Sequence, residues 1–230
     1  MDELPIPFPE IPLFPLRTVL LPGGLLPLRI FEVRYLDMIG RCHKAGKPFG
    51  VVCLTEGSEV RKRRTETNDA AAPPDSFERE AFYPVGTLSS IDVLERTQPG
   101  LLTIRCIGTQ RFRLQSTVLL PHGLWTGRAE LMADDPEVAI PDDLARFALA
   151  LRRLVQRLKG GAANPADSPL PPPHRWDDCG WVANRWCELL PLPLDDRQRL
   201  MALDNPLLRL ELVADMLDRF DLDALELGKR

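Results

Sequence analysis

The hydrophobic period changes once along the chain, and that change constrains the fold more than any other feature. Before Asp134-Asp135-Pro136, apolar residues form short runs or alternate with polar residues, which is typical of strands. After this point apolar residues recur every three to four positions, as in amphipathic helices. Strands followed by helices predict an α+β fold and argue against alternating β/α units. We expect a β subdomain over residues 9–133 and a helical subdomain over residues 134–225.

The first subdomain should be an antiparallel barrel with one helix packed against it. Apolar residues from Phe31 to Cys42 lie three to four apart, which predicts a helix that ends near Gly46. Gly108-Thr109-Gln110 is expected to be a turn. Because closure removes exposed edges, curved strands with Gly and Pro at their corners favour a closed or half-closed barrel. The expected strands are 11–14, 25–30, 49–54, 85–94, 101–107, 112–119 and 124–132, with Leu102, Ile104, Cys106, Trp125, Ala129 and Leu131 facing inward.

Residues 56–80 differ from the strands around them. This segment is polar, contains two prolines and has no hydrophobic period, so we expect a solvated loop or insertion. Its basic run, Arg61-Lys62-Arg63-Arg64, is flanked by acidic residues and lacks the interleaved aromatic residues of a nucleic-acid contact. The basic run therefore predicts a solvated loop.

The second subdomain should be a small helical bundle. Expected helix starts are Asp142, Asp177 or Asp178, Asp195 (with Gln198), and Asn205, since their side chains can accept the free N–H groups of a first turn. A Pro-rich connector, residues 162–175, separates the first helix from the second. The expected buried lines are Leu144, Phe147, Leu151, Leu154 and Leu158; Trp181, Val182, Arg185, Trp186, Leu189 and Leu190; and Leu210, Val213, Met216, Leu217 and Phe220.

Composition disfavours several classes of partner. The net charge of −4 and the pI near 5.5 provide no general attraction to nucleic acid or to anionic lipid. No apolar run reaches the ~18 residues of a membrane-spanning helix. The five cysteines are odd in number and lie mostly in apolar stretches, which fits reduced thiols in a cytoplasmic protein. We therefore expect a cytoplasmic protein without a membrane partner.

Motifs for common catalytic and metal sites are absent from the sequence. It contains no GxxxxGK[ST] phosphate loop, no GxSxG elbow, no HExxH and no CxxC. The nearest metal-like group, His174, Cys179 and Cys187, lacks a fourth ligand, and the two cysteines fit small core residues better. We predict no catalytic residue, no cofactor and no metal.

Other chemically active residues also have ordinary structural explanations. His43 and His122 are expected at the surface because neither has an acid or a nucleophile nearby in sequence. Asp134-Asp135 and Asp177-Asp178 precede helices, where acids satisfy free N–H groups and the helix dipole. Trp176 lies before a helix and is the one tryptophan expected to be exposed, which makes it a candidate for protein binding.

Several segments resemble the N-terminal domain of Lon-type proteases. IPLFPLR (residues 11–17), VLLPG (19–23) and PLRIFEVRY (27–35) resemble its opening in order and spacing, and VGTL (85–88) and IRCIGTQRF (104–112) resemble later motifs. The similarity extends over residues 9 to 220. It implies a mainly structural role for the motif residues Pro15, Leu16, Pro22, Gly23, Phe31, Glu32, Arg34, Tyr35, Gly86, Gly108, Arg111 and Phe112. Phe31 and Tyr35 should pack the helix on the barrel, while Glu32 and Arg34 tie helix to strand.

The resemblance implies a PUA-like β pseudo-barrel followed by an α-helical bundle that recognises unfolded or specific protein partners. We expect a free-standing, non-enzymatic module without ATPase or peptidase parts, which binds through the barrel face or the cleft between barrel and bundle. An RNA-contacting protein is the alternative, since PUA-like barrels also occur in RNA-binding proteins. The net charge and the lack of a basic aromatic face argue against that alternative.

Overall fold

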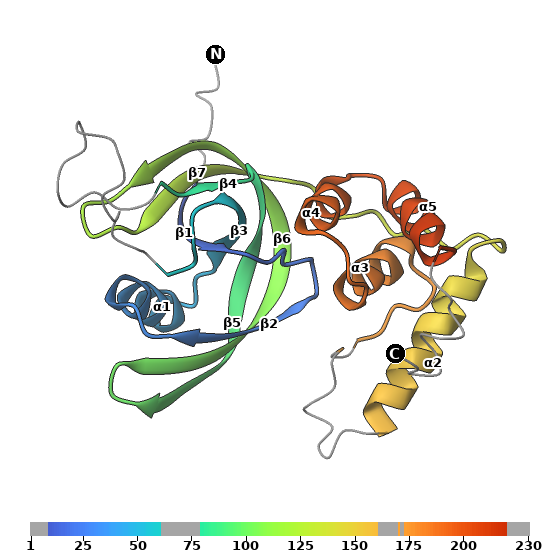
Figure 1. Cartoon of the computed structure of the whole chain (residues 1–230), viewed down its shortest axis with the longest axis horizontal. Helices are drawn as coiled ribbons and strands as arrows, with labels where there is room; N and C mark the ends of the chain where they lie inside the picture. The colour runs from blue at the N-terminus through green and yellow to red at the C-terminus, as the bar shows by residue number, and fades with distance from the viewer. Residues whose placement is uncertain (1–8, 61–78, 161–169, 171–172, 220–230) are drawn as a thin grey trace, which may run out of the picture. The chain divides into compact units, whose positions relative to one another are not determined.

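The computed structural model describes residues 9–60, 79–160, 170 and 173–219 (Figure 1). The chain divides into two compact units, which we call the β unit and the helical unit. The β unit comprises the residues up to Leu20 together with Leu26–Met132, and the helical unit comprises Leu21–Leu25 together with the chain from Ala133. Residues 61–78 of the expected loop, which include the basic run, and most of the Pro-rich connector lie outside the described residues.

Strands of the β unit close on themselves. Five follow the order β1-β7-β6-β5-β3, and β1 also pairs in parallel with β3, from Leu13 opposite Gly50 to Leu16 opposite Cys53. The other pairings of the ring are antiparallel, while β2 pairs with β6 and β4 with β3. The α+β class and the closed strand arrangement are therefore confirmed. The strands are β1 (Glu10–Leu16), β2 (Leu25–Ile30), β3 (Phe49–Glu56), β4 (Ala81–Phe82), β5 (Val85–Gln98), β6 (Leu101–Leu119) and β7 (Trp125–Leu131).

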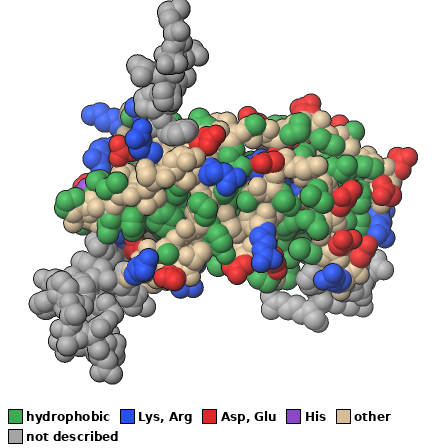
Figure 2. Space-filling model, turned by 90° about the horizontal axis from the view of Figure 1, so that it is seen from above, with side chains coloured by type: hydrophobic (Ala, Val, Ile, Leu, Met, Phe, Trp, Pro, Cys, Tyr) green, Lys and Arg blue, Asp and Glu red, His purple; other side chains and the backbone are tan. Residues whose placement is uncertain are grey.

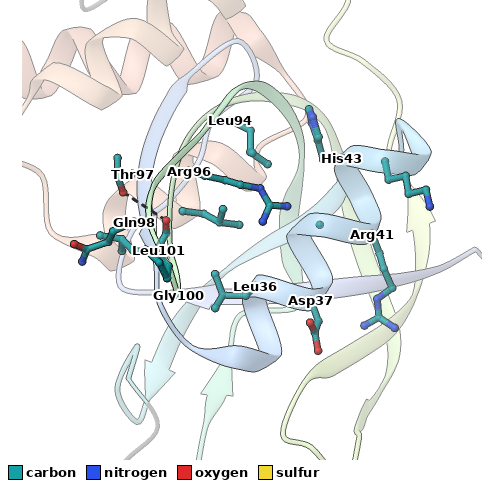
Figure 3. A pocket seen from close by; sticks show the side chains of 14 residues that line it. Leu36, Asp37, Arg41, His43, Leu94, Arg96, Thr97, Gln98, Gly100 and Leu101 are labelled. Carbon is teal, nitrogen blue, oxygen red and sulfur yellow. Dashed lines mark hydrogen bonds between the residues drawn. The ribbon is translucent and has the colours of Figure 1, made fainter.

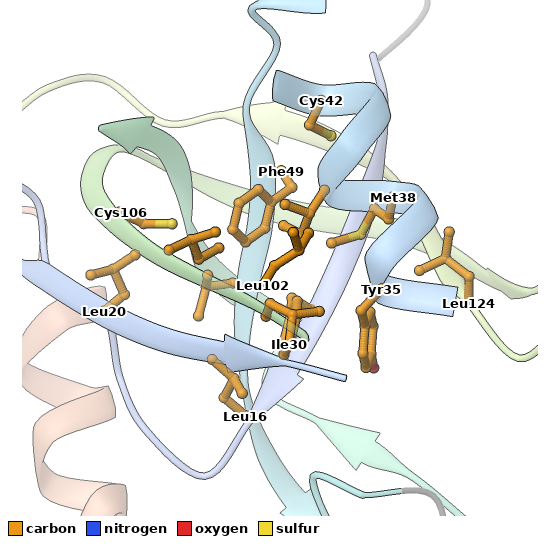
Figure 4. Close-up of a cluster of buried hydrophobic side chains, with 14 residues drawn as sticks. Leu16, Leu20, Ile30, Tyr35, Met38, Cys42, Phe49, Leu102, Cys106 and Leu124 are labelled. Atoms are coloured by element: carbon orange, nitrogen blue, oxygen red, sulfur yellow. The ribbon is translucent and has the colours of Figure 1, made fainter. Parts of the chain in front are cut away.

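One helix of the β unit, α1 (Val33–Ala45), packs against the strands (Figure 1). The side chains of Tyr35, Met38, Ile39 and Cys42 form its buried stripe, as the helical spacing predicts. Figure 4 shows Tyr35, Met38 and Cys42 within the main apolar cluster of the β unit. The Tyr35 ring stacks on Phe14, with ring centroids 4.0 Å apart. Burying a side chain of this size stabilises the fold by ~1.5–3 kcal/mol. The helix is thereby fixed to the barrel.

Phe112 fills a second apolar cluster, where two glycines make room for its ring. A Cβ atom at Gly86 would lie 2.7 Å from Phe112 Cζ and would also meet the Val51 carbonyl oxygen, and a Cβ at Gly50 would lie 2.8 Å from the same Cζ. Such distances are too short for ordinary packing. The Phe112 ring therefore requires a residue without a side chain at position 86. Gly86 and Phe112 both belong to the segments that resemble the family.

Three expectations for the β unit are wrong. Gly108-Thr109-Gln110 is not a turn: β6 is continuous, and the two residues after Gly108 lie opposite Leu88 alone as a bulge. Phe31 precedes the helix instead of packing within it and is 55% exposed. Leu131, the last residue of β7, is 45% exposed instead of facing inward.

The helical unit contains α2 (Ala145–Gly160), α3 (Cys179–Leu189), α4 (Leu194–Ala202) and α5 (Pro206–Leu217). The Asp178 carboxylate caps α3 by accepting the Trp181 N–H at 2.7 Å, and Asn205 caps α5. Other expected starts are wrong: α2 begins three residues after Asp142, and α4 begins after Pro193 with no side-chain cap. The expected buried positions are confirmed except Leu154, Trp181, Leu189 and Met216, which are half-buried, Leu158, which is 42% exposed, and Phe220, which lies outside the described residues.

Asp135 differs from its expected role at a helix start, since the next helix after it, α2, begins only at Ala145. Its carboxylate instead lies 2.5 Å from Nη1 of Arg209, a guanidinium that also donates to Asn184 Oδ1 and to the Leu200 carbonyl. Arg209 is 1% exposed. The ion pair joins the segment that precedes α2 to α5.

Candidate functional site: a groove in the β unit

A groove of about 980 Å³ lies in the β unit between α1 and the hairpin of β5 and β6 (Figure 3). Two residues of the lining shape its walls. Gly40 of α1 has no atom within 4 Å of where a Cβ would stand, so this part of the helix surface is open. Gly100 turns the hairpin with φ 79°, a conformation that favours glycine. The volume of the groove is at the upper end of the range for ligand pockets.

Strand register explains how the hairpin presents side chains to the groove. Leu94 lies opposite Ile104, and Arg96 lies opposite Leu102. Opposed residues of an antiparallel pair point to the same face, as do residues two apart along one strand. Leu102 and Ile104 belong to the main apolar cluster, so Leu94 and Arg96 point to that same side. Figure 3 shows Arg96 extending from the hairpin toward the helix.

The floor of the groove is apolar and its rim is charged. Leu36, Leu94 and Leu101 line it and are only partly buried. Around them stand five exposed titratable side chains: Asp37, Arg41, His43, Lys44 and Arg96. Apolar surface with a few polar groups at the edge is the usual chemistry of a binding site.

Helix α1 ends at the groove for local reasons. Gly46 takes a left-handed conformation with φ 60°, and its N–H donates to the His43 carbonyl, while the Lys47 N–H donates to the Cys42 carbonyl. His43 and Lys44 stand in the last turn, where positive charge suits the helix dipole. His43 is at the surface, as predicted, and so is His122.

The buried Arg34 connects the helix of the groove to the barrel. Its Nη1 donates to the Gly123 carbonyl oxygen at 2.5 Å, and its Nη2 lies 3.2 Å from Glu32 and 3.7 Å from Glu80. Glu80 accepts in turn from the Trp125 indole N–H at 2.6 Å. Glu32 and Arg34 are thus brought together, and the network holds the first turn of α1 beside the β6–β7 connection.

The remaining motif residues are not in the groove. Pro22 and Gly23 belong to the helical unit, where their carbonyl oxygens accept from Arg185 at 2.8 and 2.6 Å. Glu188 lies 2.8 Å from the same guanidinium, and burial raises the pKa of its carboxyl to about 7 despite Arg185 and Arg197. Pro15, Leu16, Gly86, Gly108, Arg111 and Phe112 are buried in strands of the β unit.

Trp176 is half-buried in the helical unit. Its ring centroid lies 4.8 Å from that of Trp181 in an edge-to-face contact and 5.0 Å from that of His174. The side chain therefore lies in a small aromatic cluster instead of projecting alone, and nothing else in the described chain marks it as a binding residue. Next to this cluster, a pocket of about 340 Å³ is lined by charges that pair with each other: Arg175 lies 2.7 Å from Glu137 and 3.3 Å from Asp178.

Two further observations bear on function. The five cysteines are buried and form no disulfide. Burial raises the pKa of the Cys106 thiol to about 11 and that of Cys187 to about 12, which suppresses thiolate chemistry. Among the described residues, no group of three or more His, Cys, Asp or Glu side chains is arranged to hold a metal ion, and no helix is long and apolar enough to cross a membrane.

The groove was not predicted from the sequence. Leu94 ends an expected strand, Arg96 lies just beyond it, and Gly40 lies on the polar side of the expected helix. The available signal was Gly40 itself, a residue unfavourable in a helix interior, together with Leu36 on the same polar side.

Comparisons with known proteins agree with the fold. The model for the ATP-dependent protease La (LON) substrate-binding domain matches residues 10–219. A solved Lon N-terminal domain protein from Xanthomonas campestris is 28% identical with a TM-score of 0.68, covering 90% of this chain and 98% of that one. The N-terminal domain of Mycobacterium avium complex Lon protease shares the fold at 14% identity and a TM-score of 0.55, covering 92% and 100%. No curated protein matches this sequence. Since the family model spans nearly all of the chain, this protein belongs to the LON substrate-binding domain family.

Proposed function

We propose that this chain is a non-enzymatic protein-binding module that takes exposed apolar segments of unfolded polypeptides into the groove between α1 and the β5–β6 hairpin. The observation that carries the proposal is the partly exposed apolar floor of Leu36, Leu94 and Leu101 in a hollow of about 980 Å³. Binding there would remove this apolar surface from water, which favours association. The family match supports the same class of function.

Alternative functions receive less support from the described surface. Basic and acidic side chains are interspersed over the face that Figure 2 shows, with apolar side chains between them. No Phe, Tyr or Trp is among the residues that line the groove, so the groove offers no platform for stacking bases. These features favour a polypeptide over RNA as the ligand.

Binding of the whole chain to a model protein, unfolded by reduction and neutral alkylation, would test the proposal. We expect the unfolded form to bind and its native form not to bind, as measured by fluorescence anisotropy. Gly40→Gln places a long polar side chain in the open part of the groove and should weaken binding at least about tenfold, ~1.4 kcal/mol. Ala45→Gln, at an exposed position of α1 outside the lining, is the matched control and should leave binding unchanged.

Three outcomes would overturn the proposal. Equal effects of the two variants would exclude the groove as the binding site. Salt-sensitive binding of an unstructured RNA, with no binding of the unfolded protein, would favour the RNA-contacting alternative. Peptide hydrolysis by the purified chain, abolished by one point substitution, would contradict the non-enzymatic role.

A further inference from the structure

The rim of the groove carries a charge opposite to that of the whole chain. Arg41, Lys44 and Arg96 are basic, whereas Asp37 is the one acid in the lining. The complete chain has a net charge of −4. None of these three basic side chains forms an ion pair with any residue that the structure describes, and all three are exposed. The excess of positive charge is therefore available to a ligand.

The basic groups stand on both walls of the groove. Arg41 and Lys44 are three residues apart on α1, so they share one side of the helix. Arg96 comes from the opposite wall, on the same face of the hairpin as Leu94. A ligand lying over Leu36, Leu94 and Leu101 would thus have cations on either side of its apolar part.

We infer that the groove selects extended polypeptide segments in which large apolar side chains are flanked by Asp or Glu. The inference rests on the proposed function and names the substrate class of that site. Apolar side chains cover the leucine floor, and carboxylates on both sides pair with Arg41, Lys44 and Arg96. Lysine-flanked segments carry the same apolar side chains but place like charges at the rim, which lowers affinity.

Three fluorescent peptides with the same leucines, flanked by Glu, Gln or Lys, test this selection against the whole chain. We expect the Glu peptide to bind about three- to tenfold more tightly than the Gln peptide, because each exposed ion pair contributes only modestly, and the Lys peptide to bind most weakly. The preference should shrink as sodium chloride is raised, since exposed charges are screened. Equal affinity for the Glu and Gln peptides would overturn the inference.

Substitutions at the rim locate the effect. The double variant Arg41→Gln with Arg96→Gln should lose most of the preference for Glu over Gln, measured as the ratio of its affinities for the two peptides. Arg128→Gln, at an exposed position of β7 outside the lining, should keep the full preference. A loss of preference in Arg128→Gln equal to that in the double variant would place the effect in the overall charge and contradict the inference.

Failure of the inference is distinguishable from failure of the proposed function. If the Glu and Gln peptides bind equally and Gly40→Gln weakens both, the groove binds polypeptide without selecting acids. If neither those peptides nor the unfolded protein binds, the protein-binding role itself fails, and the inference fails with it.

Discussion

Buried arginines organise the helical unit at the scale of single residues. Arg185 and Arg209 are each 1% exposed, and both donate to backbone carbonyls as well as to a carboxylate. Hydrogen bonds to carbonyls and a carboxylate offset much of the cost of burying these charges. Hydrophobic spacing placed Arg185 in a buried line, but it could not reveal the pair of Arg209 with Asp135, which lie 74 residues apart in the sequence.

Arg209→Met should destabilise the protein strongly. The substitution removes the buried guanidinium that pairs with the Asp135 carboxylate and donates to the Leu200 carbonyl, and we expect the free energy of unfolding to fall by about 3–5 kcal/mol. Arg199→Met is the control, because that exposed side chain lies 3.8 Å from Asp196 and such pairs contribute about 0–1 kcal/mol. Urea denaturation measures the free energy of unfolding of both variants and of the wild type. Equal losses in the two variants would mean that the buried network is not stabilising.

Glu188→Gln should change how stability depends on pH. Burial raises the pKa of Glu188 from 4.5 to about 7, so below pH 4.5 the carboxyl is protonated in both the folded and the unfolded state. Between these values the unfolded state loses its proton first, so the contribution of Glu188 to the free energy of unfolding falls as pH rises. Glutamine does not titrate, so the variant should gain stability relative to wild type from pH 4.5 to 7. Parallel pH profiles of the two proteins would contradict the shift.

At the scale of elements, two glycines of the β unit should respond oppositely to alanine. Gly86→Ala directs a methyl group into the Phe112 ring and the β3 backbone, and overpacking of this kind costs about 1–3 kcal/mol or more. Gly40→Ala meets open space in the middle of α1 and should stabilise the fold by about 0.5–1 kcal/mol through helix propensity. The Tm of each variant, measured by thermal unfolding, shows the direction of the change in stability. Similar shifts in Tm for both variants would contradict this steric account.

Element types were predictable because they depend on local period. The stripe of α1, the Asn205-Pro206 start of α5 and the inward alternation of Leu102, Ile104 and Cys106 all follow from spacing and capping chemistry. The bulge after Gly108 was not predictable, because a glycine followed by polar residues fits a bulge within one strand as well as a turn between two strands. The start of α4 also had no side-chain signal.

At the scale of the molecule, the candidate site depends on contacts that local sequence does not contain. Leu36 and Leu94 line one groove only because α1 packs on the strands while β5 and β6 extend past it as a hairpin. The family motifs contribute to this arrangement indirectly, through Arg34 and Tyr35, which hold the helix in place. Arg34 and Tyr35 thus act through the fold, whereas the residues that line the groove lie outside the segments that carry the resemblance.

Thiol labelling should report whether the two units are separate domains, as the expected subdomains 9–133 and 134–225 propose. We expect little labelling of the native protein, because all five cysteines are buried. With increasing urea, Cys42, Cys53 and Cys106 of the β unit should become reactive together, and Cys179 and Cys187 of the helical unit at a different urea concentration. Mass spectrometry counts the labels. Exposure of all five cysteines in one transition would show a single cooperative unit.

The contact between Arg185 and the Pro22-Gly23 turn has a consequence for synthesis on the ribosome. Leu21–Leu25 is the first part of the helical unit to be translated, but the guanidinium that binds the Gly23 carbonyl comes 162 residues later. The backbone leaves the β unit after Leu20, returns at Leu26 and leaves it again after Met132. Barrel strands can therefore pair while the nascent chain is still growing, whereas the helical unit stays incomplete until α3 has emerged.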